Sequence, residues 1–225
     1  MTPERFAKLK AVLTQRQHDL TVFADGVHKP HNVSAILRTC DAVGIAHLHV
    51  VADDSEFRQH HMLAGGSKRW VDITTHESSE AGIAHLRTQG WQLAVADTSE
   101  AHTAERPVVD FRSVDYTRKI AIVMGAELDG PSETSKSAAE LRISIPMHGL
   151  VESLNVSVAT AVVLYEAQRQ RVQAGLYDES RMPKLAYEKK LFEWAQPDIA
   201  RRCRDKKLGY PALTEDGDLA ENPFN

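Results

Sequence analysis

Short apolar runs, each followed by a segment with helical periodicity, constrain the fold of this chain more than any other feature. The run at 119–124, KIAIVM, is nearly continuous in its apolar residues, which is typical of a strand covered on both faces. Similar runs lie at 20–24 and 45–51, and between them apolar residues repeat at helical spacing: Val33, Ile36, Leu37, Cys40 and Val43. Strand, helix and strand in this order predict an α/β fold with a parallel sheet.

The stretch at 141–170 adds a strand, a polar loop and a long helix. Pro146 stops the strand because proline lacks the N–H group that a central strand needs. The helix after Asn155 is apolar on nearly every side, so we expect it to be buried all round. Ser153 and Asn155 stand at its entrance, where both residue types cap helices well. Two interpretations stay open: a capped core helix, or a binding site at the helix N-terminus.

Three regions outside these runs carry basic residues. A helix at 3–18 has a basic, exposed side with Arg5, Lys8, Lys10 and Arg16. A polar connection at 53–70 carries Arg58, Lys68 and Arg69 beside two glycines, a composition that suits contacts to phosphates and bases. Two short helices separated by Pro197 end in a cluster of cations: Arg201, Arg202, Arg204, Lys206 and Lys207. For the first helix, a solvated face explains each charge better than nucleic-acid binding does. The alternative for 53–70 is a long surface loop with a short helix, and a solvated helix end explains the C-terminal cluster nearly as well as phosphate binding does.

Two further segments are expected to lack regular structure. Residues 99–110 read as a hydrophilic loop, and the acidic residues from Thr214 onward read as a frayed end.

Composition and missing motifs exclude several classes of protein. The net charge of −4 argues against a chain that binds nucleic acid over its whole surface, so a polyanionic partner must meet local basic patches. The two cysteines form no CxxC pair, and no apolar run approaches the ~20 residues of a membrane span. No GxGxxG, GxxxxGK[ST] or GxSxG motif is present, and the histidines have no metal-ligand spacing. We therefore expect a cytoplasmic protein with no resident metal and no membrane association.

Three separate stretches together resemble the SPOUT class of RNA methyltransferases, in the SpoU/TrmH family. The first is HNVSAILRT, with Asn32 and Arg38, and the second is IVMGAELDG, with Gly125, Glu127 and Gly130. The third is IPMHGLVESLNVSVATAVVLYEA, with Pro146, Ser153, Leu154, Asn155 and Ser157. Each stretch alone is moderately specific, whereas all three in this order make a strong resemblance that spans about residues 20–173.

The resemblance implies a mostly parallel sheet with helices on both faces and a deep trefoil knot involving about residues 125–170. It implies three segments: an N-terminal helical extension at 1–19, the methyltransferase domain at 20–175, and a helical C-terminal extension at 176–225 that binds tRNA. S-adenosylmethionine is then the methyl donor, held largely by backbone groups at Ala96, Gly125, Ile145, Met147 and Leu154. The family dimerises through the helices of its first and third motifs, so a homodimer is expected.

The activity implied is 2′-O-methylation of a tRNA ribose, at guanosine-18. Arg38 is the proposed catalytic residue, with Asn32, Ser153 and Asn155 orienting it and the ribose, and with Glu127 holding the second motif. RNA contacts are expected from Arg5, Arg16, Arg58, Lys68, Arg69, Arg201, Arg202 and Arg204. The alternatives are 2′-O-methylation at another tRNA or rRNA position, and a catalytically silent RNA-binding protein that keeps the fold. A nucleotide oxidoreductase is a distant third possibility because the glycine fingerprint is missing.

Overall fold

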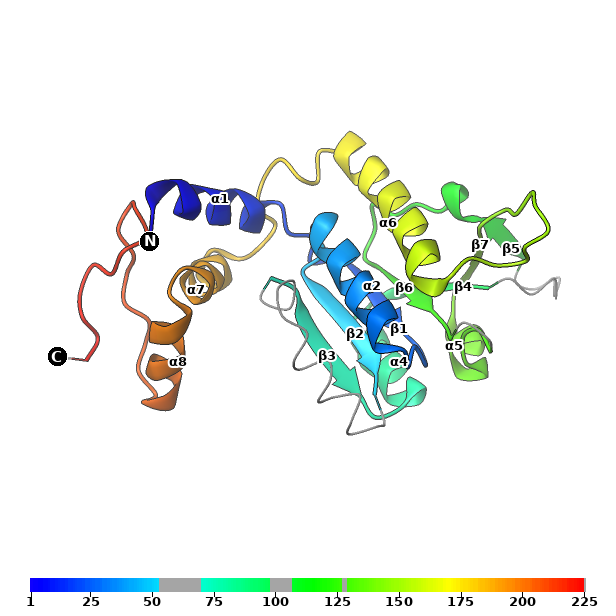
Figure 1. Ribbon diagram of the computed structural model, residues 1–225, viewed down its shortest axis with the longest axis horizontal. Coiled ribbons are helices and arrows are strands. Elements are labelled where there is room, and N and C mark those ends of the chain that lie inside the picture. The colour runs from blue at the N-terminus through cyan, green and yellow to red at the C-terminus, as the bar shows by residue number, and fades with distance from the viewer. Residues whose placement is uncertain (53–69, 98–106, 127–128, 225) are drawn as a thin grey trace. The chain divides into compact units, whose positions relative to one another are not determined.

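The computed structural model describes residues 1–52, 70–97, 107–126 and 129–224, which form two compact units (Figure 1). One unit is Gln17–Leu176, and the other combines Met1–Arg16 with Tyr177–Asn225. The division into segments at 19/20 and 175/176 stays a prediction about domains. No helix within the described ranges has the length and hydropathy needed to cross a membrane.

The unit Gln17–Leu176 is built on a parallel sheet of seven described strands in the order β3-β2-β1-β6-β4-β7-β5. Their bounds are β1 Leu20–Ala24, β2 His47–Val51, β3 Asp72–His76, β4 Gln92–Ala96, β5 Val108–Asp110, β6 Ile120–Met124 and β7 Leu141–Ser144. All the pairings between these strands are parallel, so their carboxyl ends meet at one edge. The α/β class and the parallel sheet predicted from the sequence are confirmed. The threading of residues 125–170 through a knot stays a prediction.

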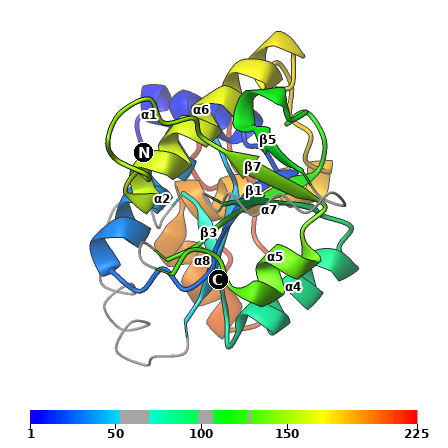
Figure 2. The same ribbon diagram turned by 90° about the vertical axis from the view of Figure 1, so that its right-hand side faces the viewer.

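Helices cover both faces of the sheet (Figure 2). On one face lie α2 (Pro30–Ala42) and α6 (Val156–Gln173), and on the other lie α4 (Ser79–Thr88) and α5 (Glu133–Ala138). Side chains alternate along each strand, so Val22 and Ile122 join the core beneath α2 and α6, while Phe23 and Val123 join the core beneath α4 and α5. The near-continuous apolar run of β6 is thereby explained, since both of its faces are buried.

Local signals place most helix ends where the sequence predicts them. The Thr2 hydroxyl accepts a hydrogen bond from the Arg5 N–H and caps α1 (Pro3–Thr14), and Asn155 caps α6 by accepting from the Ser157 N–H. Gly44 and Gly90 follow α2 and α4 with φ of 82° and 75°, the left-handed conformation that ends helices.

One expectation about this unit is wrong, and another is met only in part within the single chain. The described end of the segment at 99–110 forms β5, which pairs with β7, because a three-residue edge strand is too short to show alternation. The α6 helix is not buried all round: Val158, Tyr165 and Val172 are about half exposed in the single chain. They are spaced by seven residues and so form one stripe along the helix.

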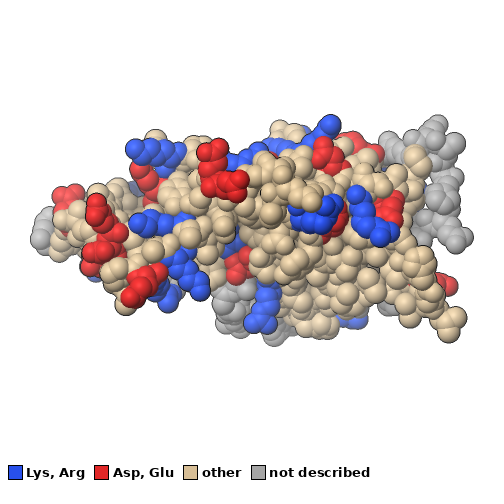
Figure 3. Space-filling model, turned by 90° about the horizontal axis from the view of Figure 1, so that it is seen from above, with Lys and Arg blue, Asp and Glu red and all other residues tan. Residues whose placement is uncertain are grey.

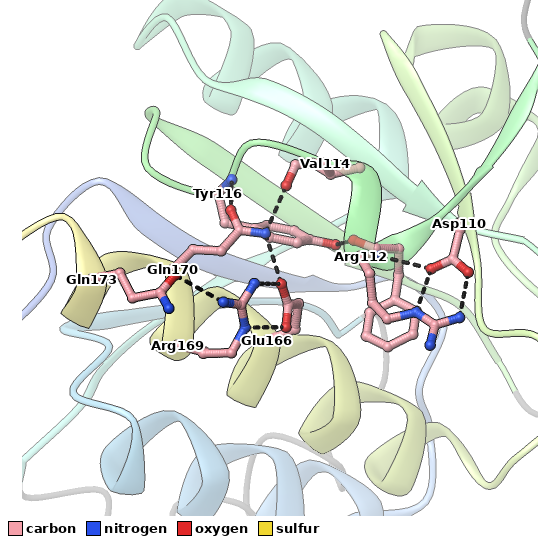
Figure 4. A network of polar contacts seen from close by, with 9 residues as sticks. Asp110, Arg112, Val114, Tyr116, Glu166, Arg169, Gln170 and Gln173 are labelled. Atoms are coloured by element: carbon pink, nitrogen blue, oxygen red, sulfur yellow. Dashed lines mark hydrogen bonds and ion pairs between the residues drawn. The ribbon is translucent and has the colours of Figure 1, made fainter.

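Polar contacts fix the C-terminal half of α6 against the segment at 110–118 (Figure 4). The Gln170 amide accepts from the Tyr116 N–H and donates to the Val114 carbonyl, while Arg169 forms paired hydrogen bonds with Glu166. The Tyr116 hydroxyl donates to the Phe111 carbonyl in η2 (Phe111–Ser113), and burial raises the pKa of that hydroxyl. These contacts hold α6, whose N-terminal residues lie at the carboxyl edge of the sheet.

The other unit contains α1, α7 (Lys184–Ala195) and α8 (Pro197–Asp205), as predicted around Pro197. Arg16 was expected on an exposed basic face, but it is 2% exposed and its guanidinium lies over the Trp194 ring. The expectation of a frayed acidic end is also wrong. Leu213 and Leu219 form an antiparallel bridge closed by a turn in which Gly217 has φ of 84°, and the Met1 amino group pairs with Asp218.

Candidate active site

A cavity of about 270 Å³ lies at the carboxyl ends of β6, β4 and β7, three neighbouring strands. Open parallel sheets place ligands at this edge. The cavity is lined by every residue expected to hold a cofactor: Ala96, Gly125, Ile145, Met147 and Leu154. Ser153 lines it as well. The structure therefore brings together segments that lie up to about sixty residues apart in the sequence.

The loop after β6 is folded tightly upon itself at the wall of the cavity. Ala126 and Gly130 exchange two backbone hydrogen bonds of 3.0 Å, and Gly130 has φ of 68°. A Cβ atom on Gly125 would lie 1.9 Å from the Pro131 nitrogen, so only glycine fits at this position. Glu127, expected to hold this loop, lies outside the described residues.

The polar residues at the entrance of α6 have separate tasks. Asn155 is the N-cap, and its side-chain amide donates to the Asn32 side-chain oxygen at 3.2 Å, which joins α6 to α2. Asn32 is 2% exposed. Ser153 is exposed in the loop ahead of the cap and does not cap the helix. The two interpretations of this entrance thus apply to different residues: Asn155 caps, and Ser153 faces the cavity.

Arg38 is exposed on α2 and is not among the residues that line the cavity. Within the described part of the chain its guanidinium has no hydrogen-bond or ion-pair partner. Asn32 and Asn155 are likewise absent from the cavity lining. The single chain brings together the five expected cofactor residues and Ser153, and it leaves Arg38 exposed on α2, outside the cavity lining.

Two buried carboxylates near the cavity were missed by sequence reasoning. Asp97 is 5% exposed, lines the cavity and pairs with Arg142 at 2.5 Å. Asp25 is 2% exposed and accepts hydrogen bonds from Ser79, Ser132 and Ser135. Each of them directly follows an apolar strand, Asp97 after β4 and Asp25 after β1. That position in the sequence was the available signal, because parallel strands deliver such residues to the edge where ligands bind.

The charge of the cavity fits the methyl donor that the resemblance implies. S-adenosylmethionine carries a positive sulfonium, a positive ammonium and a negative carboxylate group, so its net charge is positive. The lining includes the Glu152 carboxylate, whereas the Asp97 carboxylate is already paired with Arg142, and it includes no Lys or Arg among the described residues. Apolar side chains of Ile143, Ile145 and Val156 offer a surface for the adenine ring. The residues present therefore fit this group.

The basic residues expected to contact RNA differ in their exposure and in their existing contacts. Arg5, Arg201, Arg202 and Arg204 are exposed, whereas Arg58, Lys68 and Arg69 lie outside the described residues. Arg201 pairs with Asp198, and Arg204 contacts Glu193 and the Tyr210 hydroxyl. The Phe224 ring lies 4.0 Å from the Arg202 guanidinium. On the face drawn in Figure 3, acidic side chains lie among the basic ones.

The formal charge nevertheless differs between the units. Residues 17–176 hold 14 Lys and Arg against 20 Asp and Glu, whereas the helical unit holds 13 against 11.

Within the described ranges, no group of three or more His, Cys, Asp or Glu is placed to hold a metal ion.

Comparison with known protein families gives two adjacent matches. The profile described as the SpoU rRNA Methylase family matches residues 19–165, and the one described as SpoU, rRNA methylase, C-terminal, matches residues 169–222. The first match contains every residue that lines the cavity, and the second contains α7 and α8.

Individual relatives agree with these matches. The chain is 43% identical over 221 residues, 97% of its length and 94% of the relative's, to the tRNA (guanosine(18)-2'-O)-methyltransferase of Escherichia coli. It is similar to the crystal structure of the Aquifex aeolicus TrmH/SpoU tRNA modifying enzyme, with a TM-score of 0.76, 38% identity, and coverage of 87% of this chain and 97% of that one.

A structure of the SpoU methyltransferase AviRb from Streptomyces viridochromogenes contains the cofactor AdoMet. It matches with a TM-score of 0.55 and 26% identity, and covers 71% of this chain and 62% of that one.

Proposed function

Since this chain belongs to the SpoU rRNA Methylase family, we propose that it methylates a ribose 2′-hydroxyl of tRNA, at guanosine-18, with S-adenosylmethionine as methyl donor. The observation that carries the proposal is the convergence of Ala96, Gly125, Ile145, Met147 and Leu154 on one cavity at the carboxyl edge of the sheet. Relatives that cover nearly the whole chain and bear the guanosine-18 name support the choice of nucleotide.

The cavity residues would hold the methyl donor through backbone groups and apolar contacts. Gly125 leaves room for close approach of the loop backbone, and Ile145, Met147 and Leu154 would flank the adenosine. The donor supplies an activated methyl group when bound. The task left to this chain is to position a ribose hydroxyl and to manage its proton.

Arg38 is the proposed catalytic residue. A guanidinium stays protonated in proteins, so Arg38 is a poor general base. It is suited instead to hold a phosphate next to the reacting ribose and to stabilise negative charge that develops on the oxygen. Asn32 and Asn155, joined by their hydrogen bond, would fix α2 and α6 beside this site. Ser153 would contact the ribose from the cavity wall, and Glu127 would hold the second-motif loop.

We also propose that the chain acts as a homodimer. The half-exposed stripe of Val158, Tyr165 and Val172 runs along α6, next to α2, and apolar side chains at such spacing suit packing against another helix. A dimer through these helices would bring Arg38 from one copy toward the cavity of the other. The basic residues of α1 and α8, among them Arg5, Arg201 and Arg202, would bind the tRNA backbone.

Labelling identifies the modified nucleotide directly. The purified protein is incubated with unmodified tRNA and S-adenosylmethionine carrying a labelled methyl group, and the labelled nucleotide is then mapped by nuclease digestion. We expect the label on the 2′-oxygen of guanosine-18. Label at another ribose of tRNA, or on rRNA alone, would replace the proposed substrate, and failure to bind the donor would favour a silent RNA-binding role.

Replacing Arg38 tests its role. We expect Arg38→Ala to lower the rate of methyl transfer by at least about 100-fold, the scale of losing a group that stabilises developing charge. Calorimetry should show S-adenosylmethionine binding nearly unchanged, because Arg38 does not line the cavity. Arg118→Ala, which removes an exposed arginine outside α2, is the control and should keep full activity. Full activity of Arg38→Ala would remove Arg38 from the mechanism.

A further inference from the structure

Asp25 is a buried carboxylate bound by three donors from two other elements. Its Oδ1 accepts from the Ser79 hydroxyl in the first turn of α4. Its Oδ2 accepts from the Ser132 backbone N–H at 2.8 Å and from the Ser135 hydroxyl at 2.6 Å, both at the start of α5. Burying a carboxylate costs free energy unless hydrogen bonds satisfy it, so we asked what these three bonds hold in place.

The same residue holds both ends of the loop that walls the cavity. The Asp25 N–H donates to the Met124 carbonyl at 2.8 Å, which is the last residue before the loop. The Asp25 carboxylate holds the Ser132 N–H, which follows Pro131 at the end of the loop. Gly125, Ala126, Gly130 and Pro131 between these two points all line the cavity.

The described residues at the two ends of this loop are packed against each other. Gly130 and Pro131 are packed against Gly125 so closely that a Cβ atom there would overlap them. A shift of Ser132 would therefore move the backbone that faces the cavity. Because the donor is to be held by backbone groups here, the position of this loop sets the shape of its site.

We propose that Asp25 is a positioning residue for the methyl-donor site, acting through residues 125–126 and 130–131 of the loop after β6. This inference rests on the proposed function for the identity of the donor. A carboxylate suits the role because it only accepts hydrogen bonds and can satisfy three donors at once. An asparagine would direct an NH₂ group at one of the same donors and would release part of the loop or of α4.

Two serine variants separate positioning from general stability. Ser135→Ala and Ser79→Ala each remove one hydroxyl that binds the same carboxylate, the first on the α5 side and the second on the α4 side. We expect Ser135→Ala to weaken S-adenosylmethionine binding in calorimetry several-fold more than Ser79→Ala does. Asp25→Asn should weaken it by about 10-fold or more, the scale of leaving one buried donor unsatisfied. The KM for tRNA should stay unchanged in all three variants.

The affinity for S-adenosylmethionine decides the outcome, and thermal unfolding of each variant shows whether it is folded. Wild-type affinity for the donor in a folded Asp25→Asn or Ser135→Ala protein would overturn the proposal. Equal losses of affinity in the two serine variants would overturn it too, because they would show only a shared effect on stability. If Asp25→Asn does not fold, the serine pair still decides. Failure of the proposed function is distinguishable, since the wild-type protein would then bind the donor without methylating tRNA.

Discussion

At the scale of single residues, Arg171 joins the end of α6 to the start of the sheet. Its side chain is fully buried and donates to the Asp19 carboxylate at 2.6 Å, to the Gln17 side chain, and to the backbone carbonyls of Asp19, Tyr116 and Arg118. All five bonds lie within the unit Gln17–Leu176. No other described side chain on α6 reaches as many segments of the chain.

We expect Arg171→Met to lower the free energy of unfolding by about 3–5 kcal/mol, because it leaves a mostly buried carboxylate and several buried carbonyls without their donor. Urea denaturation followed by circular dichroism measures the loss. Arg169→Met, two residues earlier on the same helix, removes an exposed arginine whose ion pair is screened by solvent, and should lower the free energy of unfolding much less. A loss for Arg171→Met as small as that of the control would contradict the structural role of Arg171.

A cluster of histidines beneath α4 makes the same unit sensitive to acid. His49 Nδ1 and His76 Nε2 share a hydrogen bond of 3.0 Å, and the ring centroid of His85 lies 5.6 Å from that of His49. Burial, followed by repulsion from His47, His76 and His85, lowers the pKa of His49 to about 3. Burial also lowers the pKa of His76.

The sign of the pH dependence follows from these shifts. The unfolded chain titrates its histidines near pH ~6.5 and so binds more protons than the folded chain between that pH and about 3. Stability should therefore fall as the pH drops below ~6.5, by up to about 1.4 kcal/mol per pH unit for His49. His49→Phe should flatten the fall in the urea midpoint, whereas His148→Ala, at an exposed histidine, should not. Equal slopes for both variants would contradict the role of His49.

Residue patterns predicted the cavity better than they predicted its supports. Glycines and a proline predicted a cleft near 125–130 and 145–155, since tight turns and strand ends leave local marks in a sequence. The family resemblance then implied that Gly125, Ile145 and Leu154 hold the cofactor there. Asp25 carries one such mark, its place directly after β1, whereas Arg171 carries none. Their partners lie about 54 to 154 positions away in the chain, so only the folded arrangement shows that they are satisfied.

At the scale of elements, the strands and helices followed from periodicity, and the errors have physical causes. The β5 strand was missed because three residues at a sheet edge carry no alternation. The all-apolar sequence of α6 predicted burial on every side, to which the expected dimer contributes, and its stripe of Val158, Tyr165 and Val172 is half exposed in the single chain. A sequence pattern records that a face is apolar and does not say which copy of the chain covers it.

The proposed dimer can be tested on that stripe. We expect Tyr165→Glu to shift the protein from dimer to monomer in sedimentation analysis, because a carboxylate would be buried without a partner at the centre of the interface. Methyl transfer should fall with it, if Arg38 acts on the cavity of the other copy. Ala84→Glu places the same charge on the exposed side of α4, on the other face of the sheet, and should leave the dimer intact. A dimeric Tyr165→Glu protein would contradict the proposed interface.

At the scale of the whole molecule, the two units differ in formal charge. The unit with the cavity has an excess of acidic residues, whereas the helical unit has a small excess of basic ones. An acidic unit repels a polyanion unless another part of the chain attracts it. We therefore expect most of the proposed tRNA affinity to come from the helical unit, in which Asp198 and Glu193 neutralise part of the basic cluster on α8.

Salt dependence tests this division. Arg201→Glu combined with Arg202→Glu should weaken tRNA binding strongly at low salt, and the slope of log K against log salt should fall by roughly one for each phosphate that the protein no longer neutralises. Arg87→Glu combined with Arg118→Glu reverses the same amount of charge on the other unit, at residues that are also exposed, and should change affinity much less. Equal effects of the two pairs would mean that tRNA responds to net charge alone. An unchanged affinity in the first pair would leave α8 with a packing role, held by Phe224 over Arg202.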